Sequence, residues 1–299
     1  MTNKVFHLCK GFKINKNPSK PIIFYHIPKC AGTTFSVIFS YLFSKQIRIP
    51  GSPFGERNTD IAFDYFLKNK RKIINFNPDF IYGHLPYEFS KYFAKSFSLT
   101  ILRDPMKRCI SHFNFLCERG WLGKDLPFDK IDYEDCFKKE IVPPNIITRQ
   151  LCGLGYNKKF INEEDFNNAK NIIVNKIDLI CNVENSHDLF NLLISIYDLP
   201  NLIFQKEQVS KKRLINIDEK TMNIIRKYNE YDIKLYDYLK SNNKFYKTKT
   251  NKTPRNNKTF FYSSPDLLIN NKKHHFLNEK TFIDVSKKLK HNEFTIEET

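Results

Sequence analysis

The sequence predicts a three-layer α/β fold with a central, mainly parallel sheet flanked by helices. Short runs of β-branched and aromatic residues alternate along the chain with longer segments of helical periodicity. The first of these runs, Pro21 to Ile27, passes through a tight turn into an apolar helical segment, and this is how a parallel α/β sheet begins. With 299 residues, of which 41% are hydrophobic, the chain is long enough to bury such a core.

The elements follow in order from these patterns. The predicted strands are short apolar runs bounded by polar or turn residues, at 21–27, 79–84, 97–104, 177–183 and 202–205. The predicted helices place apolar residues at helical spacing, at 32–44, 61–70, 105–120, 133–141, 145–152, 163–175, 186–197 and 218–240. Pro105 suits the first turn of its helix, where a missing N–H costs nothing. Alternating strands and helices imply right-handed crossovers and parallel pairing.

Composition divides the chain into three parts. Residues 1–20 form a polar lead-in, 21–242 the main domain, and 243–299 a basic linker and tail whose role the sequence does not indicate. Lys244 to Lys258 holds six basic residues and no acidic one, which is typical of a linker. We expect at most one helix in the tail, near Thr281 to Leu289.

The formal charge of +17 favours anionic partners, which include phosphate-bearing cofactors, acidic glycans, nucleic acid and membrane surfaces. Seven cysteines are scattered without metal-ligand spacing, so we expect reduced thiols in the cytosol and no zinc site. The N-terminus has no apolar signal region, and no run of ~18 apolar residues could span a bilayer. We therefore expect a soluble, cytoplasmic protein.

The turn in the stretch YHIPKCAGTTFSVIF, residues 25–39, carries the first candidate site: Lys29, Gly32, Thr33 and Thr34. A helix N-terminus offers unpaired N–H groups and a positive dipole end, to which hydroxyls and a lysine add donors and charge. Phosphate would fit there. The Walker A pattern is absent because Lys29 precedes Gly32. An ordinary turn with a threonine cap is the alternative.

Arg103 carries the second candidate site. It ends the predicted strand 97–104, at the carboxyl edge where open α/β sheets bind ligands, and Ser111 follows two helical turns later. Arg103 could clamp a phosphate with two hydrogen bonds, and Ser111 could donate a hydroxyl. Alternatively, Arg103 pairs with Asp104 and Ser111 faces solvent. For Arg108 we expect a contact with Asp104 at i, i+4.

His84 is the third candidate. It ends the predicted strand 79–84 in the segment YGHLPYEF, where an imidazole with an ordinary pKa near ~6.5 could act as a general base. The alternative is a structural histidine.

Together these segments resemble the sulfotransferases that use 3'-phosphoadenosine 5'-phosphosulfate (PAPS), in particular the carbohydrate branch with the heparan and uronyl 2-O-sulfotransferases. The resemblance extends over residues 21–241 and keeps the order of the motifs. Its motifs are HIPKCAGTTF, YGHLPYEF, LRDPMKRCISHFNFL, NIITRQLCG and YNEYDIKLYDYL.

The resemblance implies a P-loop-like fold and one reaction, the transfer of a sulfuryl group from PAPS to a hydroxyl by in-line displacement. Lys29, Gly32, Thr33 and Thr34 would hold the 5'-phosphosulfate end, with Gly32 keeping the backbone open to it. His84 would take the proton of the acceptor hydroxyl, and Lys29 would stabilise charge on the departing phosphate. No metal is required.

Arg103 and Ser111 would hold the 3'-phosphate. The basic loop near 209–214 follows a predicted strand, where related enzymes often complete the nucleotide site, so Lys211 and Arg213 are further cofactor candidates; a solvated basic loop is the alternative. Cys30 stands where the family commonly has a threonine or serine, so either one hydrogen bond is missing or the position makes no contact.

The acceptor implied is a carbohydrate, which the charge allows to be acidic, and a self-associated form of the chain fits the resemblance. Two other functions remain open. A nucleotide kinase would need magnesium and acidic ligands near the loop, and no clear Walker B pattern supplies them. A non-catalytic protein that binds nucleic acid or other polyanions would show salt-sensitive binding and no dependence on His84.

Overall fold

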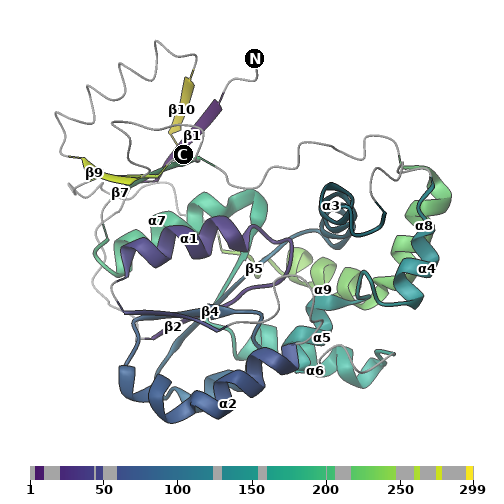
Figure 1. The fold of residues 1–299 in the computed structure, drawn as a ribbon, viewed down its shortest axis with the longest axis horizontal. Helices are drawn as coiled ribbons and strands as arrows, with labels where there is room; N and C mark the ends of the chain where they lie inside the picture. Colours follow the sequence, from purple (N-terminus) through teal and green to yellow (C-terminus); the bar gives the residue numbers. More distant parts are fainter. Residues whose placement is uncertain are drawn as a thin grey trace.

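A computed structural model gives the fold, shown in Figure 1. It describes residues 4–9, 21–43, 45–49, 59–123, 130–153, 160–199, 201–205, 217–246, 259–262, 274–277 and 294–298. At its centre lies an all-parallel five-stranded sheet in the order β3-β4-β2-β5-β6. Its strands are β2 (Ile22–Tyr25), β3 (Gln46–Arg48), β4 (Phe80–Gly83), β5 (Phe97–Leu102) and β6 (Leu179–Asn182). The predicted α/β fold is confirmed.

The connections of this sheet change direction at β2. From β2 the chain passes through α1 (Gly32–Leu42) to β3 on one side, whereas β4 leads through η1 (Tyr87–Tyr92) to β5 on the other side. Open α/β sheets bind ligands at such a switch point, outside the carboxyl ends of the strands. The carboxyl end of β2 is therefore the place to look for a site.

Helices cover both faces of the sheet, as Figure 1 shows. Ile22 and Phe24 point to the face packed by α1 and α7 (Ser186–Ile196), while Ile23 and Tyr25 point to the opposite face. That second face is packed by α2 (Thr59–Phe76), α5 (Ile146–Cys152), α6 (Glu163–Asn175) and α9 (Glu230–Ser241). The strand alternates between two buried faces, which explains its continuous apolar sequence.

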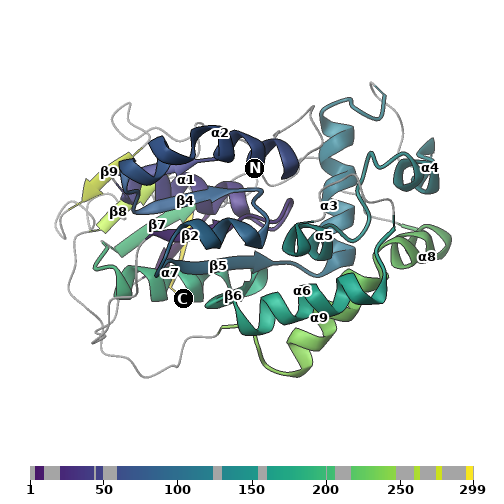
Figure 2. The ribbon, with the colours of Figure 1, turned by 90° about the horizontal axis from the view of Figure 1, so that it is seen from below.

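A third apolar cluster lies beyond the end of β5. It joins α3 (Pro105–Glu118), α4 (Tyr133–Lys138) and α8 (Glu219–Tyr228), and Figure 2 shows these helices together with α5 beyond that strand. The helices therefore form a wall beside the carboxyl edge of the sheet. None of the helices in the described ranges combines the length and the apolar character that a bilayer span needs.

A second, mixed sheet stands apart from the first, in the order β10-β1-β7-β8-β9. It combines both ends of the chain: β1 (Lys4–Cys9), β7 (Asn201–Gln205), β8 (Thr259–Tyr262), β9 (His274–Leu277) and β10 (Phe294–Glu298). β1 pairs with β10 in parallel and with β7 in antiparallel orientation. In Figure 1 this sheet lies outside the α1 and α7 layer.

Several details differ from the sequence prediction. The strand predicted at 202–205 exists, but it belongs to the second sheet. The helix predicted at 218–240 is two helices that meet at Asn229. β1, β3 and the three strands after residue 258 were not predicted, and the tail helix expected near Thr281 lies outside the described residues. The division into lead-in, domain and tail stays a prediction.

Candidate active site

Three adjacent strands end at one edge of the parallel sheet and place three of the predicted residues there. His84 follows β4 directly, Arg103 follows β5 directly, and Lys29 stands four residues after the end of β2, which lies between them. The backbone N–H of His26 donates to Gly83 O at 3.0 Å and so ties the two loops together. The sheet therefore brings together segments that are far apart in the sequence.

The loop between β2 and α1 has an unusual backbone. Lys29 and Ala31 both have positive φ, 66° and 57°, a region that residues with a Cβ rarely adopt. Among the described residues no side chain caps α1. A helix start of this kind leaves its first N–H groups to an anion. Thr34 lies buried in the first turn, and the Thr33 side chain lies outside the described part.

Gly32 is needed here for a reason that the sequence did not indicate. A Cβ on Gly32 would overlap the imidazole ring of His26. The sequence analysis expected Gly32 to leave its backbone open to the 5'-phosphate. On the side where a Cβ would point, the His26 ring fills this space instead. The glycine permits close packing of His26 against the start of α1.

Lys29 lies against an aromatic ring from α3. Its Nζ is 4.2 Å from the centroid of the Phe115 ring, a cation–π contact. The pKa of Lys29 is lowered to about 8, chiefly by burial, with a contribution from Arg103 and Arg119 and against the opposing effect of Glu118. Such a partly desolvated ammonium beside other cations would gain from an anionic partner.

The His84 ring is held in one tautomer. Its Nδ1 donates to the carbonyl oxygen of His26 at 2.8 Å, and since a carbonyl can only accept, the proton lies on Nδ1. Nε2 then carries the lone pair. Burial lowers the pKa of His84, Arg48 lowers it too, and the His26 carbonyl partly offsets both. The ring is therefore neutral at pH 7 and Nε2 is available as a base.

Two further histidines, which sequence reasoning missed, lie in the same cluster. The His26 and His84 rings are 4.5 Å apart, and burial holds the pKa of His26 well below its ordinary value. His112 comes from α3, and its Nδ1 is buried without a partner among the described residues. Burial, Arg108 and Lys29 lower its pKa to about 3. Both histidines stand inside motifs that the sequence analysis quoted, but no spacing pattern indicates that His26 and His112 lie together.

Arg103 and Ser111 are placed less closely. Arg103 is half-buried, and its Nε has no partner among the described residues, which leaves a donor for an incoming acceptor oxygen. Ser111 is half-buried on α3, and among the described residues its side chain makes no hydrogen bond with Arg103. Lys211 and Arg213 lie outside the described residues.

The predicted contact between Arg108 and Asp104 is wrong. The Asp104 carboxylate caps α3 by accepting from the Lys107 N–H at 2.9 Å. Arg108 is 0% exposed, and its Nη2 donates to Asn229 Oδ1 at 3.3 Å, where α8 ends and α9 begins. Of the two options for Cys30, the structure favours the one without a ligand contact, because Cys30 is buried in the core and burial raises its pKa to about 12.

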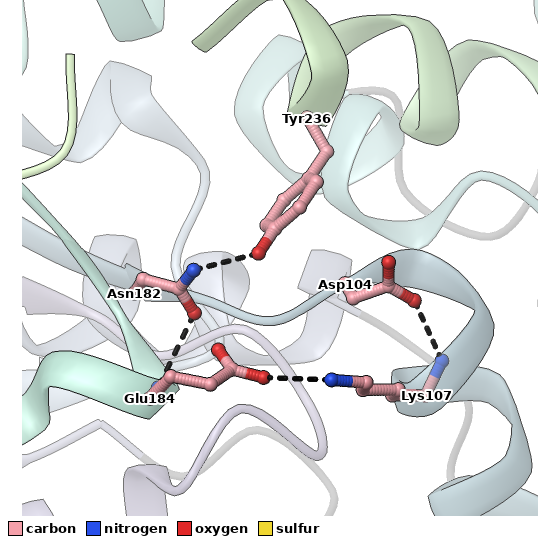
Figure 3. A network of polar contacts seen from close by, with 5 residues as sticks. All are labelled: Asp104, Lys107, Asn182, Glu184 and Tyr236. Carbon is pink, nitrogen blue, oxygen red and sulfur yellow. Dashed lines mark hydrogen bonds and ion pairs between the residues drawn. The ribbon is translucent and has the colours of Figure 1, made fainter. Parts of the chain in front are cut away.

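Polar contacts from the start of α3 and from the middle of α9 meet at the end of the outer strand β6, as Figure 3 shows. Lys107 Nζ contacts Glu184 Oε1 at 3.5 Å, next to Asn182 at the end of β6. Asn182 Nδ2 donates to the Tyr236 hydroxyl at 2.7 Å. The network links β6, α3 and α9 at the carboxyl end of β6.

The donors at this edge fit a ligand with several anionic oxygens, as PAPS has. The uncapped start of α1, the Lys29 ammonium and the unpartnered Nε of Arg103 all need acceptors. In the described part of the chain, no group of His, Cys, Asp or Glu side chains is arranged to hold a metal ion.

Fold and site together define an α/β protein in which an uncapped helix start and a neutral imidazole lie at one sheet edge. Residues 12–144 match the model of the Sulfotransferase family. This range contains Lys29, His84, Arg103 and Ser111, and the match supports a sulfotransferase family, with sulfuryl transfer as its general chemistry. The family generally uses PAPS as the donor. No curated protein sequence matches the chain significantly.

Proposed function

We propose that the protein is a PAPS-dependent O-sulfotransferase that acts on a hydroxyl of a carbohydrate, with His84 as the general base. The observation that carries the proposal is the hydrogen bond from His84 Nδ1 to the His26 carbonyl, which leaves a basic Nε2 beside the Lys29 loop. The family match adds sulfuryl transfer as the general chemistry.

PAPS, when bound, supplies a sulfuryl group, and its transfer joins sulfur to the acceptor oxygen as the bond from sulfur to the phosphate oxygen breaks. The start of α1, with Gly32, Thr33 and Thr34, would hold the phosphosulfate end. Arg103 and Ser111 would hold the 3'-phosphate, and Lys211 and Arg213 remain further candidates for the nucleotide.

The side chains divide the remaining work. His84 Nε2 accepts the proton of the attacking hydroxyl, which it can do at pH 7 because its lowered pKa keeps it neutral. The Lys29 ammonium opposes the negative charge that develops on the leaving side. Because burial lowers the pKa of Lys29 to about 8, this ammonium is less shielded by water than an exposed lysine.

The acceptor is the least constrained part of the proposal. The charge of +17 suits an acidic glycan, and the resemblance to the uronyl 2-O branch favours a carbohydrate acceptor and a self-associated chain. A cytoplasmic location, expected from the unclustered cysteines, is a further proposal.

The test is calorimetric titration with the product nucleotide, 3'-phosphoadenosine 5'-phosphate (PAP), beside AMP and ATP with magnesium. We expect PAP to bind most tightly and to lose affinity about 10- to 100-fold in Arg103→Ala, since a charge-assisted hydrogen bond contributes roughly 1.5–3 kcal/mol. Arg71→Ala, on the exposed side of α2, is the control and should bind PAP normally.

Transfer from labelled PAPS to a panel of glycans then identifies the acceptor, with His84→Ala as the inactive variant. If ATP with magnesium bound best, the kinase alternative would replace the proposal. If no nucleotide bound and polyanions bound in a salt-sensitive way, the binding protein would replace it.

A further inference from the structure

A buried amide from α5 lies between the two loops that carry His84 and Lys29. The Gln150 side chain is 1% exposed, and its Nε2 donates to His26 O at 3.2 Å and to Leu85 O at 3.1 Å. The same His26 oxygen accepts from His84 Nδ1. One side chain thus contacts the acceptor of the His84 proton and the residue that follows His84.

Gln150 itself is held in place by the start of its helix. Asp232 on α9 accepts from the N–H groups of Ile147 and Thr148, at 3.0 and 2.8 Å, and from the Thr148 hydroxyl at 2.9 Å. In return, Asn145 Oδ1, just before α5, accepts from the backbone of α9. Each helix start is capped by a side chain from the other, so α5 has little freedom to move.

We infer that Gln150 is a positioning residue for the base, which fixes the orientation and the tautomer of His84 by holding the His26 carbonyl and Leu85. The inference rests on the proposed function, in which His84 is the base. The His26 carbonyl accepts from two donors, His84 in the loop after β4 and Gln150 on α5, and so sets the position of the ring relative to the Lys29 loop. Misplacement of a catalytic group by about 1 Å can cost about 100-fold in rate.

The groups that face His84 determine what happens when this clamp is removed. The His26 ring packs on the His84 ring from the loop after β2, while the His26 carbonyl favours the protonated form of His84. Arg48, at the end of β3, opposes protonation of His84, as burial does. His112, on α3, faces the same cluster. Without Gln150, the loop after β4 is freed, water reaches the ring, and both neutral tautomers become accessible.

The experiment compares Gln150→Leu, which keeps the size and removes the donor, with Thr148→Val. The latter removes one buried hydrogen bond from the same helix and touches neither carbonyl. Gln150→Met is a second variant in case branching at position 150 impairs folding. Two-bond ¹H–¹⁵N NMR spectra of labelled protein report the tautomer and pH titration of His84, with His84→Gln to assign its signals.

In the wild type and in Thr148→Val we expect a single Nδ1–H tautomer. In both Gln150 variants we expect a mixture of the two neutral tautomers and a pKa of His84 that rises toward its ordinary value. We also expect the rate of PAPS hydrolysis, in which water is the acceptor and PAP is released, to fall about 10- to 100-fold with an unchanged KM for PAPS. An unchanged tautomer and pKa in both Gln150 variants would overturn the inference. An equal change in Thr148→Val would also overturn it, because general loosening of α5 would then be the cause.

These readouts separate the inference from the proposed function. PAP binding to the wild-type protein, followed by calorimetry, tests the sulfotransferase. The NMR tautomer tests Gln150 without any turnover, so a chain that failed to bind PAP could still show that Gln150 positions His84.

Discussion

At the scale of single residues, Lys29 titrates in an accessible range, because burial lowers its pKa to about 8. Above that pH the side chain loses the charge that would attract an anion. We therefore expect the affinity for PAP to be nearly constant below pH 8 and to fall as the pH rises through about 8 to 9. Calorimetry across this range measures it.

Lys29→Arg is the informative variant, because a guanidinium stays charged throughout this range. Its affinity for PAP should show no decline between pH 8 and 9. A wild-type affinity that is flat up to pH 9.5 would contradict a role for the Lys29 charge.

The buried histidines make the fold sensitive to acid. The pKa values of His26, His84 and His112 are all lowered in the folded protein, whereas the unfolded chain binds protons near pH 6.5. Below pH 6.5 the unfolded state binds more protons, so stability is full above that pH and falls as the pH falls. Each residue contributes up to about 1.4 kcal/mol per pH unit.

His112→Gln isolates one of these groups, whose pKa of about 3 gives it the window between pH 6.5 and 3. The slope of unfolding free energy against pH between 6 and 4.5 should become shallower by about one proton, as measured by urea unfolding. His187→Gln on α7, outside the cluster, is the control. Equal slopes in the wild type and His112→Gln would refute the prediction.

Sequence reasoning placed Lys29, His84 and Arg103 at one sheet edge and missed the residues that pack around them. Lys29, His84 and Arg103 follow strands, and parallel strands end at one edge, so their proximity could be foreseen. His26, His112 and Gln150 could not, because their roles depend on a carbonyl contact, a buried nitrogen and a helix packed from far along the chain. Such contacts have no periodicity.

At the scale of elements, the reciprocal caps of α5 and α9 concentrate stability in one carboxylate. Asp232 is fully buried, accepts from three donors and lies near the buried Arg108. Asp232→Ala leaves those donors without an acceptor and removes the negative charge near the buried Arg108 guanidinium. We expect a loss of about 3–5 kcal/mol in unfolding free energy, measured by urea denaturation.

Asp237→Ala is the matched control, because Asp237 lies on the same helix and is exposed. It should change stability by less than about 0.5 kcal/mol. Similar unfolding midpoints for the two variants would show that the caps contribute little.

Helices and strands were predicted well where the hydrophobic periodicity was strong, and less well where contacts with distant segments determine the structure. The helix at 163–175 has the predicted bounds because a capping box of Asn162 and Asp165 starts it. The three residues of β3 are too few for a pattern, and the break at Asn229 depends on Arg108, which lies 121 residues earlier.

At the scale of the whole molecule, the second sheet ties the two ends of the chain together. β10 covers one side of β1, and β7 covers the other. Deletion of residues 294–299 would leave β1 as an open edge, so we expect a lower melting temperature and concentration-dependent aggregation, followed by light scattering during thermal unfolding.

The same deletion should leave nucleotide binding intact at low temperature, because the candidate site is built from the ends of β2, β4 and β5. Loss of PAP binding with an unchanged melting temperature would mean that the second sheet contributes to the site. The full chain, prepared in parallel, is the reference. This sheet was not predicted because its strands lie far apart in the sequence, and four of them are short runs within the polar lead-in and tail.

Trp121 gives the protein an optical signal of its own. It is the single tryptophan of the chain, its side chain is 47% exposed, and its ring meets Phe115 edge-on at 5.9 Å, the same ring that Lys29 covers. Any ligand that draws the Lys29 ammonium away from Phe115 changes the electric field at the indole. We expect PAP to shift the fluorescence emission of Trp121.

Phe115→Leu, which removes the intervening ring, should reduce this shift while Trp121 stays in place. An emission spectrum unchanged at a PAP concentration that calorimetry shows to be saturating would contradict the coupling. If the shift is present, the fluorescence of the unlabelled protein reports in real time when the anion site is filled. Acceptors and inhibitors can then be screened by tryptophan fluorescence before a product assay exists.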